Sequence, residues 1–294
     1  MKSPLLELGA ISVHAVPEVT VSYDPNFLFH ALPPDFVRSQ TANLPGWSFE
    51  NGGERINLTF QSLLVRHAGR VILVDACNGN HKDRRLPRWH QRDFPYLEAL
   101  ADAGVAPEEV DTVLCTHLHA DHVGWNTRLE DGNWVPTFPN ARYLTSKEEL
   151  AYWKSSAADN PSSEHEAWND SVLPIIDAGL LDAVDSDETL SSDSTATLAL
   201  QPAAGHTPGH VHLSMRSHGL EAICCADTLH HPLQVSHPHF SLTDHDHLQA
   251  LETRRNLIAH CADSGAIVVP SHFAMAGTIS RAGISHRFVP LGEG

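Results

Sequence analysis

The stretch from residue 116 to 124 concentrates side chains that bind metal ions. His117, His119, Asp121 and His122 lie within six residues of one another. Neutral imidazole and carboxylate are the ligands that suit zinc and the neighbouring divalent metals. Composition alone rarely produces an H-x-H-x-D-H pattern, so a polar turn that happens to be rich in His is the weaker interpretation. The pattern therefore predicts a metal site.

Three further candidate ligands each follow a strand-like run in the second half of the chain. His206 comes after the run 197–201, in a tight Gly-His-Thr-Pro-Gly-His turn, and Asp227 comes after the apolar run 222–226. His272 stands in the same position after another apolar run. Each alone is more simply a capping or hydrogen-bonding residue. Together with the first cluster they supply seven ligand groups, enough for two metal ions that share one carboxylate.

The elements that must position these residues follow from hydrophobic periodicity and turn chemistry. Strands are predicted at 58–65, 70–75, 111–115, 197–201, 211–215, 221–226 and 266–269, and helices at 94–103, 146–156, 164–178 and 243–262. The acidic, Ser-rich stretch 182–193 is expected to be a surface turn. Two strand-rich halves, each flanked by helices, indicate an internally doubled, layered α/β fold. The candidate ligands fall at strand ends, where α/β proteins tend to build sites.

Residues 23–53 form a long segment rich in Pro and aromatic residues with no clear periodicity. Loops of this length in a compact domain are usually lids, oligomer contacts or disordered. We expect residues 1–294 to be one domain, with 23–53 as an irregular lid or an oligomer contact. If the segment is an oligomer contact, the protein forms a homodimer.

Composition excludes several classes of protein. The formal net charge of −17 opposes binding to nucleic-acid phosphates. No segment has the length of a membrane span and no export signal is visible, so the protein is expected to be soluble and cytoplasmic, without membrane partners. The five Cys lack C-x-x-C spacing, which disfavours a disulfide scaffold. Cys115 lies in an apolar run and is expected to be a buried structural thiol rather than a nucleophile.

Across roughly residues 58–290, the sequence resembles the metallo-β-lactamase superfamily. The matching motifs are Asp75 after its strand, His117-x-His119-x-Asp121-His122, Gly205-His206-Thr207-Pro208-Gly209-His210, Ala226-Asp227 and Ser271-His272. Within that superfamily it looks most like the group of methyl parathion hydrolase and related lactonases. His230 stands three residues after Asp227, and the stretches 277–279 and 287–290 are similar to the C-terminal end of that group's sequences. The resemblance implies a four-layered αβ/βα sandwich with two mixed sheets.

The resemblance also implies a division of the ligands between two metals. One metal would be held by His117, His119 and His206, the other by Asp121, His122 and His272, with Asp227 bridging them and Asp75 orienting a ligand histidine. The cofactors are therefore expected to be two divalent metal ions. Zinc is the first choice, although manganese, cobalt or iron also suit His and Asp ligands.

Such a centre indicates a metal-dependent hydrolase of the esterase or lactonase type. A metal-bridging hydroxide would attack the carbonyl of a small lactone or carboxylic ester, and Asp121 or His230 would deliver a proton to the leaving alkoxide. Phosphotriester or β-lactam hydrolysis could use the same attack. Iron-dependent oxygenases of the same superfamily generally carry fewer ligands. A non-catalytic metal-binding protein is the remaining alternative, favoured only by the abundant His.

Candidate walls of a substrate pocket are harder to find from sequence. Phe273 adjoins the ligand His272, and His231 closely follows Asp227. Trp47 and Phe29 are further candidates from the segment 23–53. Core packing explains any one of these aromatic residues equally well. The histidines between 237 and 247 are expected to lie on a solvated loop and helix start.

Overall fold

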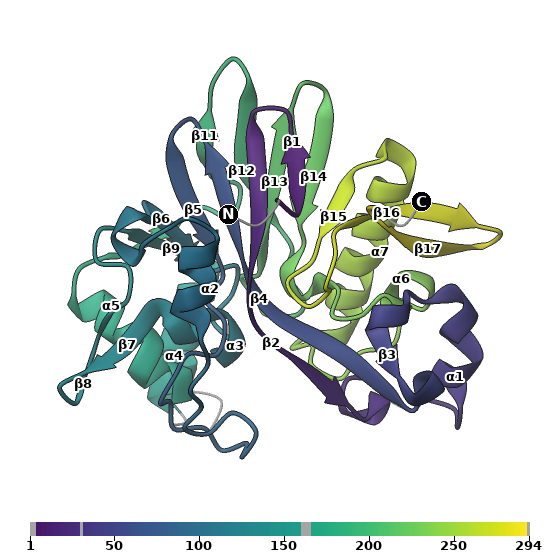
Figure 1. Cartoon of the computed structure of the whole chain (residues 1–294), viewed down its shortest axis with the longest axis horizontal. Coiled ribbons are helices and arrows are strands. Elements are labelled where there is room, and N and C mark those ends of the chain that lie inside the picture. Colours follow the sequence, from purple (N-terminus) through teal and green to yellow (C-terminus); the bar gives the residue numbers. More distant parts are fainter. Residues whose placement is uncertain (1–3, 30–31, 160–165, 293–294) are drawn as a thin grey trace. The chain divides into compact units, whose positions relative to one another are not determined.

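The computed structural model describes residues 4–29, 32–159 and 166–292. The chain separates into two compact units, and each contains a β-sheet with helices (Figure 1). The first unit comprises Met1–Val19 and Phe60–Glu188, and the second comprises Thr20–Thr59 and Thr189–Gly294. None of the helices in the described ranges is long and apolar enough to cross a membrane.

The first unit is built on a mixed sheet with the strand order β1-β2-β4-β5-β6-β9-β10. Its strands are β1 (Leu6–Leu8), β2 (Ile11–Tyr23), β4 (Arg55–His67), β5 (Arg70–Val74), β6 (Thr112–Leu114), β9 (Arg142–Ser146) and β10 (Leu181–Val184), with a separate hairpin of β7 (Thr127–Glu130) and β8 (Asn133–Pro136). Its helices are α2 (Tyr96–Asp102), α3 (Ala120–Val123), α4 (Lys147–Asp159) and α5 (Leu173–Asp177), with a π-helical turn at Trp168–Val172 before α5. Strand β2 ends, and β4 begins, in residues of the second unit.

The hairpin predicted between residues 58 and 75 is confirmed as β4 and β5, which pair antiparallel. Its turn residues Ala68 and Gly69 both have positive φ, the conformation that a tight hairpin turn requires. Strands β5, β6 and β9 then run parallel. Parallel strands end at the same sheet edge, so the residues after β5 and β6 emerge side by side. These include Asp75 and the His-rich stretch 117–122.

The second unit contains the sheet β11-β12-β13-β14-β15-β16-β17, which is antiparallel except between β14 and β15. Its strands are β11 (Thr189–Ser192), β12 (Ala196–Pro202), β13 (Val211–Ser217), β14 (Leu220–Cys224), β15 (Ile267–Val269), β16 (Gly277–Ala282) and β17 (Ser285–Pro290), while β3 (Phe49–Glu50) pairs with the start of β4. Its helices are α1 (Phe36–Gln40), α6 (Leu233–Ser236) and α7 (His247–Ser264). His206, Asp227 and His272 follow β12, β14 and β15.

Helix α7 packs an apolar face of Leu257, Ile258 and Cys261 into the core of the second unit. The sequence predicts a start at residue 243, but the helix begins four residues later. Asp246 is the reason, because its side chain accepts the first free backbone N–H groups and so caps the helix. Gly265 ends the helix with φ of 74°.

The surface turn predicted at 182–193 is found only at residues 185–188, where the N–H of Glu188 donates to the Asp185 carbonyl at 3.0 Å. Residues of this stretch form β10, which pairs parallel with β9, and β11, which pairs antiparallel with β12. Both are the outermost strands of their sheets, where half-exposed Asp and Ser side chains are tolerated because one strand edge faces solvent. The polar residues of this stretch therefore favoured a turn in the sequence although parts of it form two edge strands.

Two other stretches are more ordered than the sequence indicates. In 23–53, the described residues form α1 and short 3₁₀-helices rather than one irregular excursion. The helix predicted at 164–178 has its first two residues outside the described part of the chain, and the remainder contains the π-helical turn before α5.

Candidate metal centre

The candidate metal ligands fall into two sets, one in each unit. His117, His119, Asp121 and His122 belong to the first unit, and His206, Asp227 and His272 belong to the second. We call them the compact set and the dispersed set, because the first occupies six consecutive residues, from the loop after β6 into α3, and the second comes from three strand ends.

In the compact set, two imidazole nitrogens face each other. Nε2 of His117 lies 3.0 Å from Nδ1 of His119, and the two rings are nearly perpendicular. His117 is fully buried, whereas His119 is half-buried just before α3. Two adjacent nitrogens from different rings suit binding of one cation, since one neutral imidazole cannot use both its nitrogens toward the same ion.

Asp75 anchors the other half of the compact set. Its carboxylate accepts hydrogen bonds from the backbone N–H and the hydroxyl of Thr116, at 2.9 and 3.0 Å. The same carboxylate lies 2.9 Å from Nδ1 of the buried His122. The opposite nitrogen, Nε2, is 3.7 Å from the carboxylate of Asp121. A carboxylate behind an imidazole fixes its tautomer and leaves the other nitrogen for a metal.

Glu149 is a part of this arrangement that the sequence did not reveal. The sequence indicates a capping box at Ser146 to Glu149, and the N–H of Glu149 does donate to the Ser146 hydroxyl. Its fully buried carboxylate instead accepts from the backbone N–H of Leu118 at 3.0 Å and from Nε1 of Trp153 at 2.7 Å. Leu118 separates the two histidines that face each other. Glu149 therefore holds the backbone of the ligand loop.

In the dispersed set, the imidazoles of His206 and His272 converge on the carboxylate of Asp227, together with that of the neighbouring His230. Nε2 of His206 and of His230 lie 3.2 and 3.0 Å from Oδ2, and Nε2 of His272 lies 3.1 Å from Oδ1. All four side chains are buried. Imidazole nitrogens and a carboxylate are the types of donor that divalent metals bind.

The far sides of these imidazoles are engaged by supporting groups. Nδ1 of His206 lies 3.3 Å from the carboxylate of Asp244, and Nδ1 of His272 lies 3.2 Å from the backbone carbonyl of Thr59. Burial alone would lower the pKa of His206, but its hydrogen bonds to Asp227 and Asp244 raise the pKa to about 9. Metal-binding histidines commonly show this pattern, in which the second nitrogen donates to a carboxylate or a carbonyl. The residues present therefore fit a metal.

His230 joins the dispersed set although it is not a predicted ligand. Its ring stacks on His272 at 5.5 Å, and its backbone N–H donates to Oε1 of Gln234. Burial lowers the pKa of His230, and the neighbouring Asp227 only partly opposes this. A neutral imidazole beside a carboxylate can accept or relay a proton. Its catalytic role stays a prediction.

Aromatic candidates for the pocket wall pack inside the second unit. Both ring nitrogens of His231 have partners, since Nε2 is 2.8 Å from the Ser48 carbonyl and Nδ1 accepts from the Leu233 N–H. Burial lowers the pKa of His231 to about 4. Phe29 lies edge-on to this ring at 5.8 Å. His231 thus ties the segment 23–53 to the loop that follows Asp227.

Phe273 is fully buried and packs against Trp47 and Phe288, with ring centroids 6.0 and 5.0 Å away. These contacts are those of core residues. A role of Phe273 and Trp47 in a substrate pocket stays a prediction.

Cys115 is buried, and burial raises the pKa of its thiol to about 12. A thiol with such a pKa remains protonated at neutral pH and is not a nucleophile. His239, His245 and His247 are exposed, as expected of a solvated loop and helix start, whereas His237 is half-buried with its ring 5.0 Å from that of Phe36.

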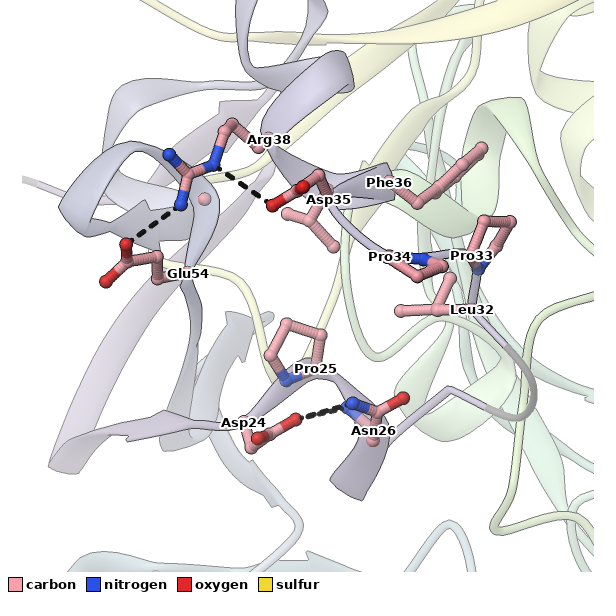
Figure 2. Close-up of a pocket in the computed structure, with 12 residues that line it drawn as sticks. Asp24, Pro25, Asn26, Leu32, Pro33, Pro34, Asp35, Phe36, Arg38 and Glu54 are labelled. Carbon is pink, nitrogen blue, oxygen red and sulfur yellow. Dashed lines mark hydrogen bonds and ion pairs between the residues drawn. The ribbon is translucent and has the colours of Figure 1, made fainter.

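One cavity lies within the segment 23–53 and its continuation to residue 54 (Figure 2). It has a volume of about 320 Å³ and includes both charged and apolar side chains. Arg38 pairs with Glu54 at 2.8 Å and with Asp35 at 3.4 Å, and both ion pairs are exposed. None of the candidate metal ligands lines this cavity. It is therefore separate from the residues assigned to the metal centre.

Comparison with known proteins places this geometry in a family. The sequence profile of the metallo-beta-lactamase superfamily matches residues 61–272, well over half of the chain. The chain belongs to the metallo-beta-lactamase superfamily. Its α/β fold with two mixed sheets is the one expected of that superfamily's sandwich.

Solved structures match nearly the whole chain. The hydrolase AbOPH is 25% identical with a TM-score of 0.77, covering 97% of this chain and 96% of the other. AidC, a dizinc quorum-quenching lactonase in complex with a product, is 22% identical with a TM-score of 0.76 and the same coverage. A curated relative, ribonuclease Z of Mycobacterium avium, is 36% identical over 77 residues. That match spans 26% of this chain and 22% of the ribonuclease.

Proposed function

We propose that the compact and dispersed sets together hold two divalent metal ions, and that the protein hydrolyses a small lactone or carboxylic ester. The observation that carries this proposal is the convergence of three imidazole nitrogens on the Asp227 carboxylate, in a chain of a hydrolase-containing superfamily. A second support is the compact set, whose His117 and His119 nitrogens face each other.

The proposed division of ligands follows the family resemblance. His117, His119 and His206 would hold one metal, Asp121, His122 and His272 would hold the other, and Asp227 would be shared between them. Zinc is the metal we expect first, because His and Asp are its common ligands. The two ions, when bound, lower the pKa of an attacking water and polarise the substrate carbonyl.

Protein groups then have to move protons and hold the ligands in place. Asp121 has a side chain 29% exposed, so it can exchange a proton with solvent. His230 lies beside Asp227 and is neutral because burial lowers its pKa, so it can take up a proton and pass it to a leaving alkoxide. The oxygen that leaves a lactone or ester needs such a proton when it is poorly stabilised.

The choice of lactone or ester is supported by the fold's likeness to AidC, a lactonase, over nearly the whole chain. Phosphotriesters and β-lactams remain alternative substrates because they accept the same nucleophile. Nucleic acid is a weaker candidate despite the ribonuclease Z match, since the net charge of −17 repels a polyanion.

The experiment that tests the proposal combines metal analysis with a substrate panel. Purified protein should contain two divalent ions per chain, and it should open lactones or cleave aryl esters faster than paraoxon or nitrocefin. Dialysis against a chelator should abolish turnover, and added zinc should restore it. Two bound ions with no turnover on any of the four substrate classes would contradict the hydrolase proposal.

The proton-transfer role of His230 has its own test. In His230→Gln, hydrolysis of esters with poor leaving groups should fall by about 10²-fold or more, while esters of good leaving groups should be less affected. His239→Gln, which changes an exposed histidine of the following loop, is the matched control. Full activity of His230→Gln on every ester would exclude the role.

A further inference from the structure

Arg254 of α7 is among the largest fully buried side chains of the protein. Its guanidinium contacts three separate segments of the second unit. Nε donates to the Thr228 carbonyl at 2.7 Å, Nη1 donates to the Pro238 carbonyl at 2.8 Å, and Nη2 lies 3.2 Å from the carboxylate of Asp244. A buried arginine cannot lose its charge and so must be paired. Arg254 therefore links these three segments to α7.

Asp244 connects this arginine to the dispersed set. Its side chain is 1% exposed, and Oδ1 lies 3.3 Å from Nδ1 of His206. Nε2 of the same ring is 3.2 Å from Asp227. The carboxylate thus engages the nitrogen that faces away from the proposed metal, as Asp75 does for His122.

The backbone from Ala204 to His206 is also held by the residues just before α7 and by Thr253 of α7. Its carbonyl accepts from the N–H of His245 at 3.0 Å, and the Gly205 carbonyl accepts from the N–H of Asp246 at 2.9 Å. The hydroxyl of Thr253 donates to the Ala204 carbonyl at 2.7 Å. The loop that carries His206 therefore cannot shift without breaking contacts to α7.

Gly205 shows how close this approach is. Its φ is 132°, and a Cβ added there would lie 2.3 Å from the backbone nitrogen of Ala250 in α7. Only glycine allows the loop to sit against the helix. Because Thr228 directly follows Asp227, Arg254 fixes the segment of a second ligand from the same helix.

We propose that Asp244 and Arg254 are positioning residues that present His206 and Asp227 to the metal. Asp244 sets the tautomer and orientation of the His206 ring, and Arg254 holds Asp244 and the backbone after Asp227 in register. Neither residue needs to touch substrate or metal. This inference rests on the proposed function only for the assignment of the metal site, and not on the identity of the substrate.

The test compares Asp244→Asn and Arg254→Lys with the full-length wild-type chain. Asp244→Asn keeps the size of the side chain but removes its charge, so the affinity for one of the two metal ions should fall by about 10- to 100-fold. Arg254→Lys keeps a charge but loses the planar fork, so a smaller loss of affinity is expected. Metal-free protein is titrated with zinc against a chromophoric chelator.

A spectroscopic signature separates positioning from general destabilisation. In metal-free wild-type protein, ¹⁵N spectra of the His206 ring should show a proton on Nδ1 directed to Asp244, and Asp244→Asn should shift that signal. The matched control is Asp263→Asn, on the same helix, where an exposed aspartate pairs with Arg281. This control should leave zinc affinity and the His206 spectrum unchanged.

Wild-type zinc affinity and an unchanged His206 spectrum in folded Asp244→Asn would overturn the proposal. If Asp244→Asn does not fold, the same two measurements on Arg254→Lys decide in its place. Loss of affinity in these variants, together with a wild-type enzyme that is inactive on the whole substrate panel, would leave the positioning role standing and refute the hydrolase function.

Discussion

The compact and dispersed sets provide similar ligands by different routes. His117 to His122 lie on one short segment that runs into α3, where chain connectivity already brings the side chains together, and Asp75 and Glu149 hold that segment. The dispersed set comes from three strand ends, and its neighbours His206 and Asp227 depend on contacts made by α7. A local motif needs anchoring of one loop. A dispersed site needs a scaffold that fixes several loops at once.

This difference explains which features could be predicted from sequence. The ligands themselves were visible, because His and Asp at strand ends have few other uses in such numbers. Glu149 and Asp244 were not visible, since each contacts a backbone or ring more than 30 residues away and resembles an ordinary surface acid in sequence. Arg254 looked like one of many helix charges. Its burial is a property of the tertiary structure alone.

The secondary structure shows the same difference between features set by neighbouring residues and features set by distant ones. The hairpin of β4 and β5 was predictable because its turn residues are adjacent in sequence. Strands β10 and β11 were not, because their polar residues favour a turn locally and become strands only by pairing with β9 and β12. The assignment of 1–294 as one domain stays a prediction.

The largest effect is expected from removing the charge of Asp227, the residue on which the imidazoles of the dispersed set converge. In Asp227→Asn the charge that attracts three imidazoles is lost, and we expect hydrolysis to fall by at least about 10³-fold, roughly 4 kcal/mol of activation free energy. The measurement is kcat/KM on the best substrate of the panel. Asp187→Asn, at an exposed turn, should retain full activity. Equal rates in the two variants would refute a role for Asp227.

Removing the anchor of the compact set should have a smaller effect. Asp75→Asn weakens the hydrogen bond to His122 and those from Thr116 but leaves all ligands present, so metal affinity should fall by about 10- to 100-fold. Chelator competition measures this directly. An effect equal to that of Asp244→Asn would show that both sets depend equally on their supporting carboxylates, whereas no effect would contradict the role assigned to Asp75.

Glu149→Ala tests whether this carboxylate stabilises the backbone that carries the compact set. The buried N–H of Leu118 and the indole N–H of Trp153 lose their acceptor, so the free energy of unfolding should fall by about 1 to 3 kcal/mol. Urea denaturation of the metal-free protein measures it. Glu148→Ala, on the exposed side of the same helical turn, should change stability much less. If the two variants are equally stable, Glu149 does not hold the loop.

Each unit buries a basic side chain, Lys82 in the first and Arg254 in the second. The two differ in how they respond to pH. Lys82 is fully buried, donates to Thr127 and lies over the ring of Trp134, and burial lowers its pKa to about 7. Between pH 7 and 9 the unfolded state therefore holds more protons on Lys82, which contributes a rise in stability of about 1 kcal/mol per pH unit, whereas the raised pKa of His206 contributes a slope of opposite sign in the metal-free protein. Arg254 gives no such slope because it stays charged.

Lys82→Met should remove the contribution of Lys82 and so lower the slope of stability against pH by about 1 kcal/mol per unit relative to wild type. Lys147→Met, at an exposed lysine, should keep the wild-type slope. The free energy of unfolding from urea titrations at pH 7, 8 and 9 provides the measurement. A slope in Lys82→Met equal to that of wild type would contradict the contribution assigned to Lys82.

The central claim is that the two sets share one dinuclear centre bridged by Asp227. Electron paramagnetic resonance of the metal-free protein titrated with Co²⁺ tests it most directly, because exchange coupling requires a common bridging ligand. We expect a coupled pair at two equivalents per chain, and uncoupled ions in Asp227→Asn. Two magnetically independent ions in the wild-type protein, or saturation at one ion per chain, would contradict the claim.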